Sequence, residues 1–214
     1  MDENTVTCHD FYAFVYYAEI PRDVEIGEIT NTARSEELSS VRNSTVRIEK
    51  YCAWRLLEYA LACTFGENAD AEKLWRDPSG KWRGEGVELS VSHSRGAVAV
   101  ALSNRPIGVD IEPLDGERAE KFAMRFLTEG EKRLYLQTPK EDRGVEAIRL
   151  WCAKEAEFKS LCESVFAPSA LDSTKYPTRT YTVRIGEDDF CLAVCSDGAK
   201  SAEVIPTPIS DYLK

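Results

Sequence analysis

A long helix pattern followed by three short strand patterns occurs twice in this sequence, and this doubled order most restricts the possible folds. The first helix is expected over 44–65, where Trp54, Leu57 and Leu61 share one face and Gly66 ends the run. The second long helix is expected over 142–163. The strand patterns after the two helices span 87–93, 97–103, 107–112, 180–186, 190–196 and 202–206. This order predicts an α+β fold of two similar lobes, 1–105 and 106–214, with the active site in the cleft between them.

Shorter patterns complete the expected order of elements. An aromatic and β-branched run over 11–20 predicts a first strand, and helices are expected near 116–127 and 129–138. The strands of the first half are joined only by the short segments 94–96 and 104–106. Such short joints are typical of hairpins, so the three strands are expected to pair in sequence.

Composition excludes several classes of protein. The 214 residues carry a net charge of −10, which disfavours a general nucleic-acid-binding role and requires a local basic cluster for any anionic partner. The acidic start and the lack of a long apolar run indicate neither a signal peptide nor a membrane span. Seven cysteines without paired metal-ligand spacing read as reduced core residues of a cytoplasmic protein, and two histidines disfavour a zinc site.

The segment "PIGVDIEP" (106–113) sets two carboxylates on an apolar strand. Asp110 and Glu112 are two residues apart, so their side chains point to the same face, about 6–7 Å from each other. Their repulsion is about 2–3 kcal/mol at an effective dielectric constant of about 20. An edge strand with two hydrated acids is one reading of this pair. The other is a Mg²⁺ site, because hard oxygen ligands on one face are what this ion prefers.

A second constellation lies in "RLWCAKEAEFKSL" (149–161). Glu155 and Lys159 are four residues apart and therefore neighbours on a helix, which is often no more than an exposed ion pair. Trp151 shares a face with Glu155, which draws this acid toward the buried side and favours a functional role.

Two further motifs carry polar groups. In "SVSHS" (90–94), His93 and Ser92 end a strand; His93 is either a turn histidine or a phosphate contact. Thr128 and Glu131 have the spacing of a helix capping box, which by itself explains Glu131. No glycine-rich phosphate loop or nucleophile elbow occurs. Phosphate chemistry would therefore depend on a metal and on basic side chains.

In this order, S-H-S, G-V-D-I-E, F-L-T-x-x-E and W-x-x-K-E-A-x-x-K resemble the motifs of the 4'-phosphopantetheinyl transferase superfamily, in its larger two-lobed type. The resemblance covers about residues 34–165. It implies transfer of the 4'-phosphopantetheine arm of coenzyme A to a serine of an acyl or peptidyl carrier protein, with release of adenosine 3',5'-bisphosphate. It also implies a fold of two similar lobes and a monomer.

The resemblance assigns roles to individual residues. Asp110, Glu112 and Glu155 would hold Mg²⁺ on the pyrophosphate of coenzyme A, and Lys159 would face that pyrophosphate. By the same resemblance, His93, in the S-H-S motif with Ser92, would contact a phosphate of coenzyme A, the 3'-phosphate. Further basic residues are candidates for the phosphates: Lys81, which precedes Trp82 where the family has proline, Arg47 and Lys50 in the first helix, and Arg34 or Arg42 before it.

The chemistry requires a base for the serine proton, and Glu112 and Glu131 are candidates, with Glu112 preferred. A basic surface of Lys132, Arg133, Lys140 and Arg143 is expected to receive the carrier protein. Two alternatives remain open: a metal-dependent phosphodiesterase or nuclease, and a protein that binds coenzyme A or a carrier without transfer.

Overall fold

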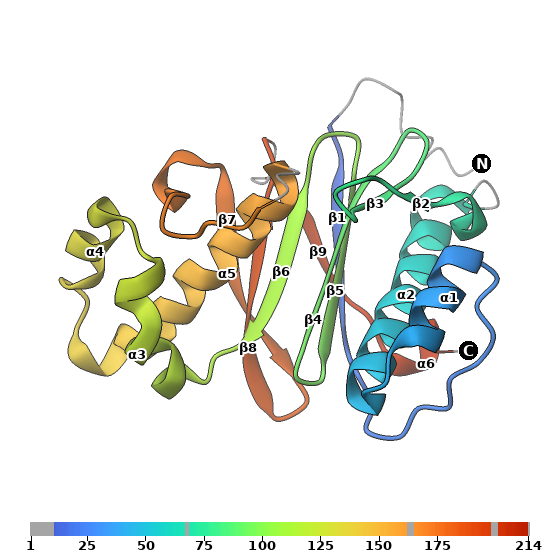
Figure 1. Ribbon diagram of the computed structural model, residues 1–214, viewed down its shortest axis with the longest axis horizontal. Coiled ribbons are helices and arrows are strands. Elements are labelled where there is room, and N and C mark those ends of the chain that lie inside the picture. The colour runs from blue at the N-terminus through green and yellow to red at the C-terminus, as the bar shows by residue number, and fades with distance from the viewer. Residues whose placement is uncertain (1–10, 67–68, 162–164, 198–200, 214) are drawn as a thin grey trace.

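The computed structural model describes residues 11–66, 69–161, 165–197 and 201–213. These residues form an α+β fold in which two small sheets pack face to face and a long helix covers the outer face of each (Figure 1). The elements with their bounds are β1 Ala13–Glu19, α1 Thr32–Ser40, α2 Ser44–Phe65, β2 Trp75–Arg76, β3 Trp82–Arg83, β4 Glu88–Ser94, β5 Ala97–Ser103, β6 Gly108–Pro113, α3 Gly116–Phe126, α4 Glu129–Tyr135, α5 Arg143–Leu161, β7 Thr178–Ile185, β8 Asp188–Cys195, β9 Glu203–Pro206 and α6 Ile209–Tyr212, with single 3-10 turns at 71–73, 140–142 and 173–175.

The first sheet has the strand order β4-β5-β1-β9 and lies against α2. A two-residue turn joins β4 to β5, and both of its residues, Arg95 and Gly96, have positive φ angles of 40° and 90°. This turn type fits the twist of a hairpin, and it confirms the pairing expected for these two strands. Helix α2 begins after Asn43, whose side chain caps it, and ends at Gly66 with φ at 61°, as predicted.

The second sheet has the order β6-β8-β7, and all its strands are antiparallel. The expectation that β6 continues the first sheet as a hairpin partner of β5 was wrong, because β6 pairs with β8. Val109 and Ile111 on β6 point into the apolar layer between the sheets, where they meet the alanines of β5. A strand that supplies this layer from the opposite side must belong to the second sheet.

The last strand returns to the first half. The strand β9 was expected to complete the second sheet, and this was wrong: it runs parallel to β1 in the first sheet. Helix α6 then brings Tyr212, which is 2% exposed, into the core beside α2, where its hydroxyl donates to the carbonyl of Glu19 at 2.5 Å. The division at 105–106 and the similarity of the two lobes stay predictions.

Of the remaining local expectations, those for three helices were confirmed, while one helix was not predicted and one cysteine differs from expectation. The helices expected near 116–127 and 129–138 are α3 and α4, and the long helix expected over 142–163 is α5, with 162–164 outside the described residues. Helix α1 was not predicted, because its sequence is polar and has no apolar period. Four of the five described cysteines are buried and all five are free thiols, but Cys63 is exposed, contrary to expectation. None of the described helices has the length and apolar character of a membrane span.

Candidate active site

The two carboxylates of β6 lie where the edge strands of the two sheets run side by side. Asp110 is 3% exposed, and its Oδ1 accepts a hydrogen bond from Ser92 Oγ at 2.7 Å. Glu112 Oε2 accepts from Ser94 Oγ, also at 2.7 Å. Ser92 and Ser94 on β4 thus match Asp110 and Glu112 in register, because both pairs have the two-residue period of a strand. The serines of "SVSHS" therefore hold the two acids in place.

Helix α5 packs closely on β6 because residue 108 is glycine. A Cβ atom at Gly108 would lie 1.8 Å from the carbonyl oxygen of Ala156 and 2.6 Å from the amide nitrogen of Ser160. This approach brings Lys159 over the strand, with its Nζ 2.6 Å from Asp110 Oδ1 and 3.1 Å from Ser92 Oγ. The same ammonium lies 3.9 Å from Glu155 Oε2. The structure thus gathers the acids and the lysine that the two motifs predicted.

Two acids of this cluster, Glu112 and Glu155, have a raised pKa. Burial raises the pKa of Glu155 to about 7; Lys159 opposes the rise, while Asp110 and Glu112 add to it. Burial also raises the pKa of Glu112, although the bond from Ser94 acts against it. For Lys159, burial alone would lower the pKa, but Asp110 and Glu155 raise it above its usual value. Three carboxylates share one ammonium, and a further cation would relieve their repulsion.

The atoms of this cluster bear on whether it can hold a divalent cation. Within the described ranges, no three His, Cys, Asp or Glu side chains are already gathered as a metal-binding group, and the ammonium of Lys159 occupies the place beside Asp110. However, Asp110 Oδ2 is buried and has no hydrogen-bond partner. An unpartnered buried carboxylate oxygen beside two acids of raised pKa fits an additional hard cation, which Asp110, Glu112 and Glu155 would hold.

Lys159 also lines a cationic pocket of about 310 Å³. The tryptophans Trp54 and Trp82 form one wall, with ring centroids 4.8 Å apart. The basic residues along it come from both halves of the chain: Arg34, Lys50, Arg76, Lys81, His93 and Lys159. A pocket of this kind can hold a multiply charged anion, even though the chain as a whole is acidic.

The predicted phosphate ligands take different places around this pocket. His93 and Lys50 line it, as does Arg34, whereas Arg47 is exposed and is not among the residues that line it. Burial lowers the pKa of His93 to about 4, and the nearby cations Lys50 and Arg34 lower it further, so the imidazole is neutral near pH 7. Its Nδ1 lies 3.3 Å from Glu49 Oε2.

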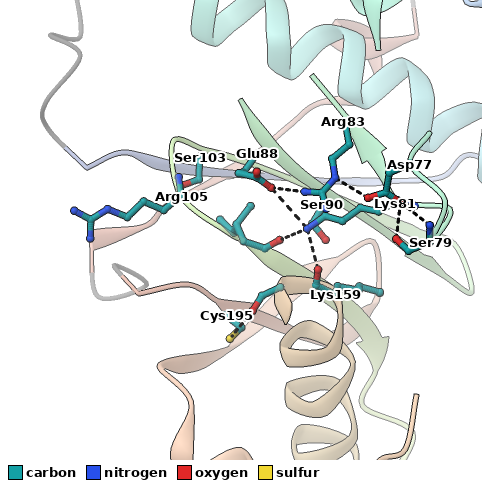
Figure 2. Close-up of polar contacts among 12 residues, drawn as sticks. Asp77, Ser79, Lys81, Arg83, Glu88, Ser90, Ser103, Arg105, Lys159 and Cys195 are labelled. Carbon is teal, nitrogen blue, oxygen red and sulfur yellow. Dashed lines mark hydrogen bonds and ion pairs between the residues drawn. The ribbon is translucent and has the colours of Figure 1, made fainter. Parts of the chain in front are cut away.

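Lys81 has a structural task in addition to lining the pocket. Its Nζ donates to the carbonyl of Lys159 at 2.9 Å and to that of Ile107 at 3.3 Å (Figure 2). It lies 4.0 Å from Glu88, which Arg83 also contacts. Lys81 therefore ties the turn between β2 and β3 to the end of α5 and to the entry of β6.

Glu131 has the role that its capping-box spacing predicted. Its side chain accepts from the backbone and the hydroxyl of Thr128 and also from Ser173, and Lys154 lies 2.7 Å away. Burial acts to raise its pKa, but the bonds from Lys154 and Ser173 lower it below the usual value. Both oxygens are engaged and the side chain is 1% exposed, so the structure offers Glu131 no access to a substrate proton.

Glu112 also borders an apolar groove of about 450 Å³, which shares no lining residue with the cationic pocket in the described part of the chain. Its apolar walls are contributed by β6, α3 and α5: Pro113, Ala119, Phe122, Phe126, Ile148 and Trp151. Phe122 is 42% exposed. The acidic cluster thus lies between a cationic pocket and an apolar groove, an arrangement that suits a ligand with an anionic and an apolar end.

Two residues associated with this pocket escaped prediction: Arg76, which lines it, and Glu37, which contacts three of its cations without lining it. Arg76 lies next to a turn, and Glu37 lies in the polar helix α1, so neither belongs to a periodic pattern. Arg76 stands over the ring of Trp82, with its guanidinium carbon 4.8 Å from the centroid. The only sequence signal for such a group is a glutamate with Arg or Lys residues elsewhere in the chain. Because these residues have no fixed spacing, the signal does not show which of them meet.

Comparison with known proteins adds to this geometry. Residues 106–208 match the model of the 4'-phosphopantetheinyl transferase superfamily. A stretch of 83 residues is 32% identical to "4'-phosphopantetheinyl transferase gsp" of Aneurinibacillus migulanus. This match covers 38% of the present chain and 34% of the relative, so the chain matches about a third of that relative's length. The family match contains Asp110, Glu112, Glu155 and Lys159.

Proposed function

Since the chain belongs to the 4'-phosphopantetheinyl transferase superfamily, we propose that it transfers the 4'-phosphopantetheine arm of coenzyme A to a serine of an apo carrier protein. The products are the holo carrier and adenosine 3',5'-bisphosphate. The observation that carries the proposal is the cluster of Asp110, Glu112, Glu155 and Lys159, which lies between a cationic pocket and an apolar groove.

The two hollows suit the two ends of coenzyme A. The nucleotide end carries the phosphates, and the pocket of Arg34, Lys50 and Arg76 supplies positive charge for them. The pyrophosphate would then lie at the acidic cluster, next to Lys159. The pantetheine arm and the carrier serine would approach from the groove that Glu112 borders.

In the proposed reaction, the serine oxygen attacks the phosphorus nearer the pantetheine. A new phosphorus–oxygen bond forms, the bond to the bridging oxygen breaks, and adenosine 3',5'-bisphosphate leaves with that oxygen. Lys159, held against Asp110, offsets the negative charge that grows on the leaving phosphate. Glu112 accepts the serine proton, and its raised pKa brings it closer to the value that suits a base near neutral pH.

A divalent cation, Mg²⁺ in this proposal, supplies Lewis-acid charge on the pyrophosphate oxygens when bound. Asp110, Glu112 and Glu155 would be its protein ligands. Support comes from the unpartnered Oδ2 of Asp110 and from the raised pKa of Glu155.

The decisive experiment incubates the protein with coenzyme A, Mg²⁺ and an apo carrier protein and measures the intact mass of the carrier. A gain of one phosphopantetheine arm is expected, and it should be absent without coenzyme A. If the carrier gains no mass and the protein instead cuts nucleic acid that is added with Mg²⁺, the phosphodiesterase alternative holds. Binding of coenzyme A without any mass gain over a long incubation would identify a non-catalytic binder.

A further inference from the structure

One carboxylate, that of Glu37, holds three of the cations that line the pocket. Its Oε2 lies 2.7 Å from Arg34 Nη1 and 2.6 Å from Arg76 Nη2. Its Oε1 accepts from Lys50 Nζ. The three cations come from α1, α2 and β2, so Glu37 is the point where these separate segments are joined. Glu37 itself does not line the pocket.

The charges around Glu37 do not balance. Burial acts to raise its pKa, but Lys50, Arg34 and Arg76 lower it to about 2, so the carboxylate is ionised at any working pH. Three positive groups minus one negative group leave two positive charges. Arg34 is 5% exposed, and its Nε is buried without a hydrogen-bond partner. The side chains of Lys50 and Arg76 are 27% and 38% exposed, so water screens part of their charge, whereas the charge of Arg34 is shielded. The excess of positive charge at the pocket suits an anion from outside, and a dianion balances it.

The two guanidinium groups are also fixed in orientation. The guanidinium carbon of Arg34 lies 5.5 Å from the ring centroid of Trp54, and that of Arg76 lies 4.8 Å from that of Trp82. Stacking sets the plane of each group, and the shared oxygen of Glu37 sets its rotation in that plane. Without this carboxylate, three like charges would repel one another and turn away from the pocket.

We propose that Glu37 is a positioning residue that determines specificity: it joins Arg34, Lys50 and Arg76 into one preformed acceptor for a phosphate dianion. The pocket then prefers a ligand that ends in a phosphate monoester over the same ligand without it. In its choice of ligand this inference rests on the proposed function, under which the terminal group is the 3'-phosphate of coenzyme A.

The test compares the dissociation constants of coenzyme A and 3'-dephospho-coenzyme A by calorimetry, in the full chain and in Glu37→Gln. The variant should bind coenzyme A about tenfold or more weakly and bind the dephospho form within about twofold of the unchanged protein. Loss of folding would weaken the binding of both ligands together, so the informative quantity is the ratio of the dissociation constant of the dephospho form to that of coenzyme A. Glu36→Gln is the matched control, because Glu36 is the exposed neighbour on α1. Tighter binding of coenzyme A by Glu37→Gln would overturn the inference, since Glu37 would then merely compete with the ligand.

A second variant and a simpler ligand complete the design. Arg76 is on an exposed strand, so Arg76→Gln should fold. It should also lower the ratio of the dissociation constant of the dephospho form to that of coenzyme A. In the double variant, the Glu37 change should weaken coenzyme A binding less than it does alone, because one of the three cations that Glu37 positions is gone; full additivity would count against the inference. Inorganic phosphate separates the two proposals. If neither nucleotide binds, the proposed function fails, yet phosphate binding that is lost in Glu37→Gln would still support the role of Glu37. Phosphate binding that is absent or equal in both proteins would refute it.

Discussion

Lys159 Nζ lies 2.6 Å from Asp110 Oδ1, and this contact joins the helix α5 to the strand β6 at the centre of the candidate site. Asp110 is 3% exposed, so the pair is mostly shielded from water on the strand side. Removing one partner of such a pair leaves a buried charge uncompensated. Each partner thus has a structural and a chemical role, and suitable substitutions can separate the two.

Replacement of Lys159 should affect chemistry more than folding if the substituent keeps the stem. In Lys159→Met, we expect kcat for transfer to fall by about 100-fold or more, because the charge that offsets the leaving phosphate is lost. Lys159→Arg should recover part of kcat. The measurement is the rate of holo carrier formation at saturating coenzyme A, with thermal unfolding as the control. A kcat near that of the unchanged protein would remove Lys159 from the reaction.

The acids can be tested with neutral variants of the same shape. Asp110→Asn and Glu155→Gln are expected to abolish transfer while the protein stays folded, because both lose a ligand for the cation. Asp110→Ala and Glu155→Ala should do the same. Transfer is measured by carrier mass, and folding by circular dichroism. Either neutral variant turning over at nearly the normal rate would show that its carboxylate is not a cation ligand.

Gly108→Ala tests the contact that brings α5 onto β6. The added methyl group would lie 1.8 Å from the carbonyl oxygen of Ala156, which belongs to the backbone and cannot rotate away. We expect a loss of stability of about 3 kcal/mol or more. The matched control is Gly130→Ala, where the nearest atom is the hydroxyl oxygen of Thr128 at 4.0 Å. Chemical denaturation measures both, and equal stabilities would mean that α5 and β6 are not in such close contact.

The buried His93 should make stability depend on pH on the acid side. Its pKa is about 4 in the folded protein, against 6.5 for an unperturbed histidine. Above pH 6.5 the imidazole is neutral in both states and costs nothing. As the pH falls from 6.5 toward 4, the unfolded chain takes up the proton and the folded one does not. The free energy of unfolding then falls by at most about 3 kcal/mol, at about 1.4 kcal/mol per pH unit.

The measurement is the difference in free energy of unfolding between the protein and His93→Gln from pH 7 to 4. This difference cancels the opposite contribution of Glu155 and Glu157, whose raised pKa of about 7 makes the fold gain stability as the pH falls. A difference that does not change with pH would show that His93 titrates normally in the folded protein.

The carrier surface predicted on α4 has the charge of Lys132 and Arg133 and two exposed leucines nearby, Leu134 and Leu136. Arg143, predicted for the same surface, donates to the carbonyls of Thr138 and Leu136, and its part in docking stays a prediction. Reversal of charge in Lys132→Glu with Arg133→Glu should raise KM for an acidic carrier about tenfold and leave KM for coenzyme A unchanged. Lys73→Glu, also at an exposed position, is the control. An unchanged carrier KM would place docking elsewhere.

Most of the local elements and most of the acidic cluster follow from the sequence alone. The apolar period of 44–65 with Gly66 behind it predicts α2, and Thr128 with Glu131 predicts the cap of α4. Asp110 with Glu112 and Glu155 with Lys159 were found in the same way. These signals are local because a helix or a strand repeats its own geometry within a few residues, and side chains at that period must share a face.

Which strands pair and which cations meet depends on contacts between elements that are distant in the sequence. The partner of β6 depends on the apolar layer between the sheets, and the place of β9 depends on the open edge of β1. The residues of each strand do not by themselves indicate its partner. Arg34, Lys50 and Arg76 come from three segments without a common period and converge on Glu37. Charged side chains have no periodic signature when their neighbours lie on other elements, so the fold alone turns scattered charges into a pocket.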